Sequence, residues 1–396
     1  MNMLEKITRV QSILQKQGID GWLLYDFQKR NPTAMQFLEI PSSVFLSRRL
    51  LYWIPAKGDP VKIVHATEEH VVDHIPGKKV TYFTWEALQQ EVQNLLQGVH
   101  CCAMEYSPYN AIPAISFVDG GTLDWIRSIV PKIVSSGNFI QEFTCALTPL
   151  QRQSHLYAAQ VLEEAVVEAW GFVSKAFKEN QKITEYDLQQ KIASYIESRG
   201  CMFEAGPICA VNANSSNPHY VPTKEEHQEI RKGDFVLIDL WCKKKQQGSI
   251  YADICKVAVA DSNPTKEQQE IFDLVRLAQK KATDFIIQKS QTGQKILGWE
   301  VDKIARDVIE KAGYGKYFVH RTGHNIYEQD HGPGTHLDSI ETLDDREIIP
   351  ETCFSIEPGI YLPGKFGVRL EYDVFLTKEK TVEISGGIQD EIVCLL

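Results

Sequence analysis

Two apolar stretches, VLIDLW (residues 236–241) and YADICKVAVA (residues 251–260), decide the fold of the second half of the chain. Both are rich in strand-forming residues, and Gly248 lies in the polar segment between them, so they predict a β-hairpin. Asp239 and Asp253 interrupt the two strands. A carboxylate in an apolar strand is costly unless something pairs with it. Each acid taken alone is equally explained by a strand position that faces solvent.

Helical and strand-like patterns surround this hairpin. Residues 151–396 combine long amphipathic helical patterns with a strand-rich last third, which predicts an α+β domain with helices on one face of an antiparallel sheet. Thr184 and Asp187 predict a capping box at the start of one of these helices. In residues 1–150, short apolar strands alternate with helices, which is typical of an α/β domain. The pattern of predicted helices and strands changes near Pro149, so we expect two domains with a boundary there.

Length and composition fit a soluble two-domain protein. The chain has 396 residues, more than one hydrophobic core usually spans. Its formal net charge of −10 disfavours a nucleic-acid partner. The N-terminal segment is charged throughout, unlike a secretion signal, and no apolar run approaches the roughly 20 residues of a membrane span. The nine cysteines are scattered without a CxxC pair. We therefore expect a cytoplasmic protein with reduced thiols and no membrane partner.

Acids and histidines gather in the second half of the chain. Glu357 in FSIEP and Glu371 in GVRLEYDVFL also stand in apolar strand sequence, and four of the eleven histidines fall between His320 and His336. A shared divalent cation would neutralise several carboxylates at once. A ligand set of Asp, Glu and His without thiolate suits Mn, Co, Fe or Zn. Five such ligands suit two metals about 3.5–4 Å apart.

Four short motifs resemble those of the pita-bread metallopeptidases, the family of aminopeptidase P, prolidase and methionine aminopeptidase. These motifs are HRTGHNI (320–326), FSIEPGIY (354–361), GVRLEYDV (367–374) and NPHYVP (217–222). The first three are similar to the family's histidine, EPG and Arg-x-Glu motifs, and the fourth to a segment of its proline-directed members. The first 150 residues resemble the creatinase-type N-terminal domain. The resemblance implies that domain followed by a pita-bread catalytic domain.

The resemblance assigns two metal ions to five residues: Asp239, Asp253, His324, Glu357 and Glu371. Asp239 would bind one metal. Asp253 and Glu371 would bridge the two. His324 and Glu357 would complete the second. A hydroxide held between the metals would attack the scissile carbonyl, and Glu357 would pass its proton to the leaving nitrogen.

The same match places further residues around the substrate: His219, His320, His331, Arg369 and Tyr361. His219 and His331 would flank the scissile bond. Arg369 lies two residues from Glu371 on a strand, hence on the same face, and would orient a metal ligand. Taken alone, His219 equally fits a residue that caps a turn, and His331 an ordinary loop residue. His227 and His336 match no family position and are expected at the surface.

The family implies hydrolysis of the bond between an N-terminal residue and proline. The chain would be a Xaa-Pro aminopeptidase or Xaa-Pro dipeptidase that uses Mn, or else Co, Zn or Fe, and that forms a homodimer. Methionine aminopeptidases are typically shorter, so the first 150 residues argue against that role. Two alternatives stay open, a creatinase-like hydrolase or lyase and a catalytically silent binding protein. Both usually lack one or more of the five ligands, and all five are present here.

Several positions beside the expected site depart from the family pattern. Asp239 and Asp253 are 14 residues apart, which is more than usual and predicts a lengthened hairpin turn at 243–247. Residues 325–327 read Asn-Ile-Tyr where the family often has Gly-Ile-Gly. The acid that usually follows the substrate histidine is replaced by Gly332. These changes border the pocket, so they leave the substrate preference open.

Overall fold

The structure is a computed structural model that describes residues 1–396. The chain divides into two compact units, Met1–Thr144 and Cys145–Leu396. None of the helices is both long and apolar enough to cross a membrane.

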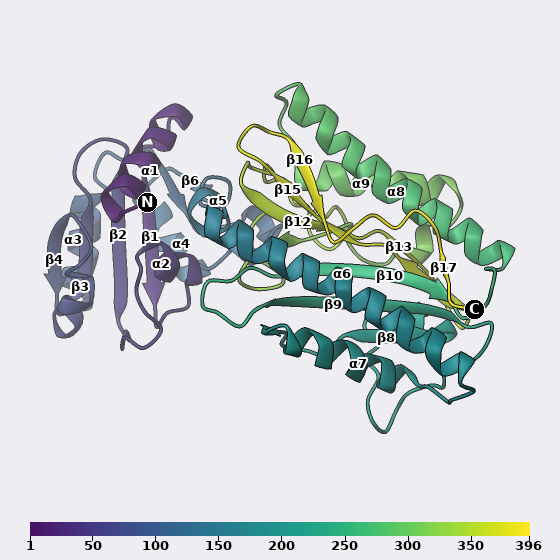
Figure 1. Ribbon diagram of the computed structural model, residues 1–396. Coiled ribbons are helices and arrows are strands. Elements are labelled where there is room, and N and C mark those ends of the chain that lie inside the picture. Colours follow the sequence, from purple (N-terminus) through teal and green to yellow (C-terminus); the bar gives the residue numbers. More distant parts are fainter. The chain divides into compact units, whose positions relative to one another are not determined.

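The first unit is an α/β domain built on one six-stranded sheet (Figure 1). The strand order is β4-β3-β2-β1-β5-β6, in which β2 pairs antiparallel with β1 and β3 and the other neighbours are parallel. The strands are β1 (Gly21–Phe27), β2 (Arg49–Pro55), β3 (Val61–His65), β4 (Lys78–Tyr82), β5 (Cys101–Met104) and β6 (Lys132–Ser135). The helices are α1 (Met3–Gln17), α2 (Pro32–Phe37), α3 (Trp85–Leu95), α4 (Gly120–Arg127) and α5 (Gln141–Thr144).

Both faces of this sheet are covered, because alternate residues of β1 enter different cores. Trp22 and Leu24 pack with residues of α1 and α2. Leu23 and Tyr25 pack with residues of α3 and α4. Successive side chains of a strand point to opposite faces, so a strand buried on both sides begins here with the continuous apolar run GWLLY.

The second unit is an α+β domain with three sheets. One sheet has the order β17-β10-β9-β7 with β8 also paired to β9, the next has the order β11-β12-β15-β16, and β13 pairs with β14. The strands are β7 (Cys201–Met202), β8 (Ile208–Val211), β9 (Phe235–Lys244), β10 (Ala252–Val259), β11 (Asn325–Ile326), β12 (Thr352–Ile356), β13 (Gly359–Leu362), β14 (Phe366–Arg369), β15 (Tyr372–Leu376), β16 (Val382–Ser385) and β17 (Val393–Cys394). The helices are α6 (Pro149–Lys178), α7 (Glu185–Ser198), α8 (Lys266–Gln291) and α9 (Gly298–Lys311). The capping box of Thr184 and Asp187 begins α7 as predicted.

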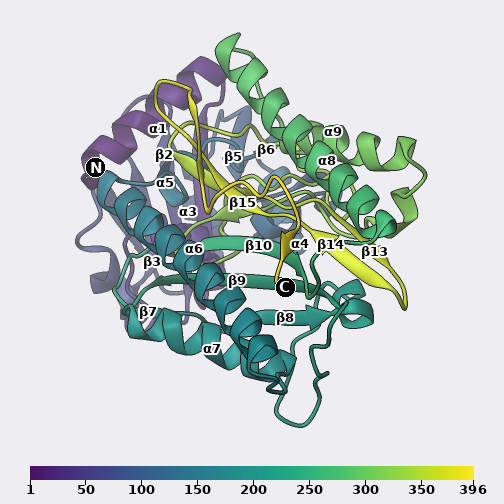
Figure 2. The same cartoon turned by 45° about the vertical axis from the view of Figure 1, so that its right-hand side comes forward.

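Two hydrophobic cores meet the two faces of the β9–β10 hairpin, and helices α6 and α7 cover one of these faces. Val236 and Ile238 of β9 pack in a core with α6 and α7. Phe235 and Leu237 of the same strand pack in a core with α8 and α9. Figures 1 and 2 show the two helix pairs running separately, each pair side by side. The apolar run FVLI is the sequence signature of a strand that is buried on both faces.

Candidate metal centre

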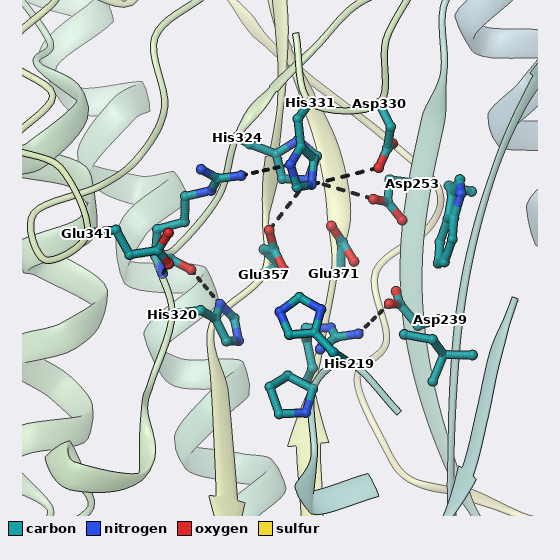
Figure 3. A pocket seen from close by; sticks show the side chains of 15 residues that line it. His219, Asp239, Asp253, His320, His324, Asp330, His331, Glu341, Glu357 and Glu371 are labelled. Carbon is teal, nitrogen blue, oxygen red and sulfur yellow. Dashed lines mark hydrogen bonds and ion pairs between the residues drawn. The ribbon is translucent and has the colours of Figure 1, made fainter. Parts of the chain in front are cut away.

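A pocket of about 300 Å³ in the second unit collects the predicted chemistry (Figure 3). All nine residues predicted for the metals and the catalytic roles line it: His219, Asp239, Asp253, His320, His324, His331, Glu357, Arg369 and Glu371. Tyr361 lies behind this lining and reaches it through hydrogen bonds to His320 and Arg369. Six further residues complete the wall: Ile208, Pro218, Trp241, Arg321, Asp330 and Glu341.

The β9–β10 hairpin places two of the acids on one face. Cys255 of β10 lies opposite Asp239 of β9, and Asp253 lies opposite Trp241. Because side chains alternate along a strand, Asp239 and Asp253 are diagonal neighbours on the same face. Strand β9 runs on to Lys244, where it pairs with β7. The extra residues between the acids therefore lengthen the hairpin beyond the site and leave the acids in register.

The other three predicted ligands stand at strand ends that meet this face. Glu371 lies between β14 and β15, and its backbone N–H donates to the carbonyl of Cys255 at 3.1 Å. Glu357 directly follows β12, and its N–H donates to the carbonyl of Thr322 at 2.7 Å. The backbone N–H of His324 donates to Ser355 Oγ at 3.1 Å. Backbone bonds thus fix all three side chains at the pocket wall.

The ligand atoms converge in a way that fits metal ions. His324 Nε2 lies 3.7 Å from Asp253 Oδ2 and 3.5 Å from Glu357 Oε1. Ligand atoms of Asp253, His324 and Glu371 all lie within 4.8 Å of one another. One buried oxygen on each of Asp239, Asp253 and Glu371 has no hydrogen-bond partner. Buried carboxylates are normally paired, so these oxygens require cations as partners. An oxygen-rich ligand set with one imidazole suits divalent metal ions.

Burial, with a smaller contribution from mutual repulsion, raises the pKa values of three acids in the pocket. Burial raises the pKa of Asp253 well above its usual range, and the charges of Asp330 and Asp239 raise it further. Burial also raises the pKa of Glu371, with the charge of Asp253 next. Burial raises the pKa of Glu357 to about 7, although Arg369 and Arg321 oppose this shift. Divalent ions would lower the free-energy cost of burying these charges, because they would neutralise the four carboxylates.

A chain of hydrogen bonds holds Arg369 against the acids. The Arg369 guanidinium is ion-paired with Asp239 and donates from Nη1 to the Tyr361 hydroxyl at 2.8 Å. The Tyr361 hydroxyl lies 2.7 Å from His320 Nε2, and His320 Nδ1 lies 2.7 Å from the carbonyl of Arg321. This pattern assigns the proton of His320 to Nδ1 and leaves Nε2 to accept. Burial lowers the pKa of His320 to about 3, so the ring is neutral. Both of its nitrogens are engaged in hydrogen bonds.

The two histidines expected beside the substrate face the pocket in different ways. The His331 ring lies against the His324 ring with the centroids 4.1 Å apart and the planes tilted by 47°, and His331 Nδ1 lies 3.1 Å from Arg321 Nη2. Burial lowers the pKa of His331 to about 4. His219 is exposed, and its ring points into the pocket (Figure 3). Its backbone N–H donates to Asn217 Oδ1 at 3.1 Å, which explains the local turn without using the ring.

Three charged residues of the pocket were not predicted from the sequence, Arg321, Asp330 and Glu341, and one histidine was predicted in the wrong place. Arg321 adjoins the recognised histidine motif, which is the one signal that pointed to it. Asp330 and Glu341 lie in loop sequence with no periodic pattern to place them. His336, expected at the surface, is 7% exposed, and its Nδ1 accepts a hydrogen bond from the Asn325 N–H at 3.1 Å. A polar loop residue of this kind becomes buried only through the path of the whole loop.

Comparisons with known proteins found similar sequences and similar folds. Residues 152–378 match the family description Metallopeptidase family M24. The chain is 30% identical over 296 residues to a Xaa-Pro dipeptidase of Lactobacillus helveticus, an alignment that covers 74% of this chain and 73% of that protein. Dipeptidase PepE from Mycobacterium ulcerans has a similar structure, with a TM-score of 0.68, 19% identity and coverage of 99% and 98%. An X-prolyl aminopeptidase from Caenorhabditis elegans, described as cytosolic with a di-nuclear active site, gives a TM-score of 0.62 at 17% identity and covers 99% of this chain and 63% of that one.

Proposed function

The chain belongs to metallopeptidase family M24, and from this premise we propose that it is a metal-dependent Xaa-Pro peptidase. It would hydrolyse the peptide bond between an N-terminal residue and proline. The observation that carries the proposal is the convergence of five predicted ligands, three of them with unpartnered buried oxygens, in one pocket. The relative from Lactobacillus helveticus, named a Xaa-Pro dipeptidase, supports the substrate class.

The residues divide into metal holders and groups that act on the substrate. Asp239, Asp253, His324, Glu357 and Glu371 would hold two divalent ions. The bound ions would polarise the scissile carbonyl and activate a water molecule. Manganese suits this oxygen-rich ligand set, and Co, Zn and Fe accept the same ligands.

Proton transfer and charge stabilisation fall to groups around the ions. Glu357 would take a proton from the attacking water and deliver it to the proline nitrogen as the bond breaks. His219 and His331, on the pocket wall, would donate hydrogen bonds to the oxygen that gains charge. Arg369 would keep Asp239 oriented through their ion pair. We further propose a homodimer in the cytoplasm, as the family resemblance implies.

The test is cleavage of an alanyl-proline dipeptide and an alanyl-prolyl-alanine tripeptide by chelator-treated protein, with and without added Mn. The Asp253→Asn variant is the control, because it keeps the size of the side chain and removes the charge of one proposed ligand. Metal-dependent cleavage by the native protein alone is the expected result, and the preferred length separates dipeptidase from aminopeptidase. Metal binding without cleavage of either peptide would contradict the proposal and favour a hydrolase or lyase of other substrates.

A further inference from the structure

Asp330 is a carboxylate of the pocket that none of the proposed catalytic roles uses. It lies in the loop after β11, lines the pocket, and precedes His331 in the chain. Its Oδ1 is buried without a hydrogen-bond partner. Its Oδ2 lies 3.8 Å from His331 Nε2, which is beyond hydrogen-bond distance. A part-buried carboxylate that receives no hydrogen bond would be stabilised by a bound cation.

Asp330 forms no ion pair with an arginine or a lysine of the pocket. Six carboxylates and two guanidinium groups line the pocket. Two divalent ions and the two guanidinium groups would together carry six positive charges, equal to the six negative charges of the carboxylates, so Asp330 stands out by its lack of an ion pair and not by excess charge. Arg369 pairs with Asp239. The other guanidinium, of Arg321, contacts His331 Nδ1 and forms no ion pair with Asp330. Metal binding would also remove the repulsion by Asp239 and Glu357, which together with burial raises the pKa of Asp330 to about 7.

The neighbourhood of Asp330 suits a long side chain with a charged end. Asp330 and Asp253 lie on the same side of the pocket with their carboxylates directed inward (Figure 3). Trp241 lies opposite Asp253 in the β9–β10 ladder and lines the same pocket. An indole wall covers the methylene groups of lysine or arginine well, and a carboxylate beyond it receives the charged end.

We propose that Asp330 makes the enzyme prefer a positively charged side chain, lysine or arginine, in the residue before proline. This inference rests on the proposed function, because a Xaa-Pro dipeptide carries positive charge only on its first residue. The α-ammonium of that residue is common to all such substrates, so a preference among them comes from the side chain. A second source of positive charge is a metal ion, since ligand atoms of Asp330, His324 and His331 lie within 4.8 Å of one another. The experiment separates the two sources.

The kinetic arm compares lysyl-proline with norleucyl-proline, which has nearly the same shape and no side-chain charge. For the native enzyme we expect kcat/KM to be about 10–100-fold higher with lysyl-proline, the range of a charge-assisted hydrogen bond. In Asp330→Asn the ratio is expected to fall to about one. Glu341→Gln removes another carboxylate of the same pocket and is expected to keep the native ratio. An equal fall in kcat/KM for both substrates in Asp330→Asn, with their ratio unchanged, would overturn the inference.

Two binding arms distinguish this inference from the proposed function. Calorimetry on the Mn-loaded protein compares the products lysine and norleucine, and selective lysine binding that is lost in Asp330→Asn is the expected result. Selective binding without cleavage of either dipeptide would refute the proposed function and leave the role of Asp330 standing. Cleavage of both dipeptides without selective lysine binding would support the proposed function and refute the role of Asp330. Elemental analysis completes the test, because loss of bound Mn in Asp330→Asn would make Asp330 a metal ligand and overturn the inference.

Discussion

Arg369 and Asp239 form an ion pair within the pocket, between Nη2 of the guanidinium and Oδ2 of the carboxylate. Asp239 Oδ1 has no hydrogen-bond partner, so the arginine holds one oxygen and leaves the other available to a metal ion. The same guanidinium bonds to Tyr361, which bonds to His320. Arg369 therefore links the proposed metal site to the neutral histidine on the other wall of the pocket.

Replacement of Arg369 by methionine should lower metal affinity or kcat/KM about 10–100-fold, the usual effect of losing a group that orients a metal ligand. Arg369→Lys keeps the charge but cannot hold Asp239 and Tyr361 together, so it should recover little. Tyr361→Phe is the matched control, because it spares the ion pair and should cost about tenfold or less. Calorimetric titration with Mn and steady-state kinetics measure both quantities. Native values of both in Arg369→Met would show that the ion pair is not needed.

Metal removal should lower the thermal stability of the second unit. A ligand that binds only the folded protein stabilises it by about 2.7 kcal/mol at 100 times its dissociation constant. We expect Mn to raise the unfolding temperature of the native protein and EDTA to reverse the effect. In Asp253→Asn the Mn shift should vanish, and the metal-free variant should be more stable than the metal-free native protein, because one uncompensated buried charge is gone.

Calorimetric scans of both proteins with Mn and with EDTA measure these shifts. Asp345→Asn removes an exposed acid from the same unit and should keep the native response. An undiminished Mn shift in Asp253→Asn would place the stabilising metal elsewhere.

The sequence predicted the parts of the site that local patterns encode. Asp239 and Asp253 were recognisable because acids rarely interrupt apolar strands, and His324, Glu357 and Glu371 because short motifs surround them. These five residues do meet in one pocket, although their roles as ligands stay predictions.

Other features depend on how distant segments pack. Nothing local distinguishes Asp330 from any acid in a glycine-containing loop, and only the pairing of β11 with β12 brings that loop to the pocket. The hydrogen bond that engages His320 Nε2 comes from Tyr361, which is 41 positions further along the chain.

The first unit should lose stability as the pH rises through neutrality, because of Glu105. This carboxyl is 2% exposed and accepts hydrogen bonds from Trp22 Nε1 at 2.6 Å and Asn31 Nδ2 at 2.7 Å. Burial raises its pKa from 4.5 to about 7. The folded state therefore binds a proton more tightly than the unfolded state. This contribution is complete below about pH 4.5 and is lost as the pH rises through about 7, and it amounts to about 3 kcal/mol.

The Glu105→Gln variant isolates this effect, because it cannot ionise. The free energy of unfolding of the full chain, measured in urea by tryptophan fluorescence from pH 5 to pH 8, should fall more steeply for the native protein than for the variant. The difference between the two slopes cancels every other titrating group. Parallel slopes would show that Glu105 keeps the same pKa in the folded and unfolded states.

Asp302 should be the side chain of α9 on which the histidine loop most depends. It is fully buried, is ion-paired with Arg306 at 3.2 Å, and accepts hydrogen bonds from Thr322 N at 2.9 Å and Thr322 Oγ1 at 2.6 Å. The Thr322 carbonyl in turn accepts from the Glu357 N–H. Asp302→Ala leaves the Arg306 charge buried without its partner, so we expect a loss of about 3–5 kcal/mol in the free energy of unfolding.

The control lies on the same helix at the same spacing. Asp307 pairs with Lys303 at 3.0 Å, but both side chains are substantially exposed, so Asp307→Ala should cost at most about 0.5 kcal/mol. Asp302→Asn keeps the size of the side chain, and its free energy of unfolding should lie between those of Asp302→Ala and Asp307→Ala. If the loop transmits the damage, Asp302→Asn should also lower Mn affinity at a temperature where the variant is still folded. A variant with lower stability and native Mn affinity would show that Asp302 supports the helix alone and not the site.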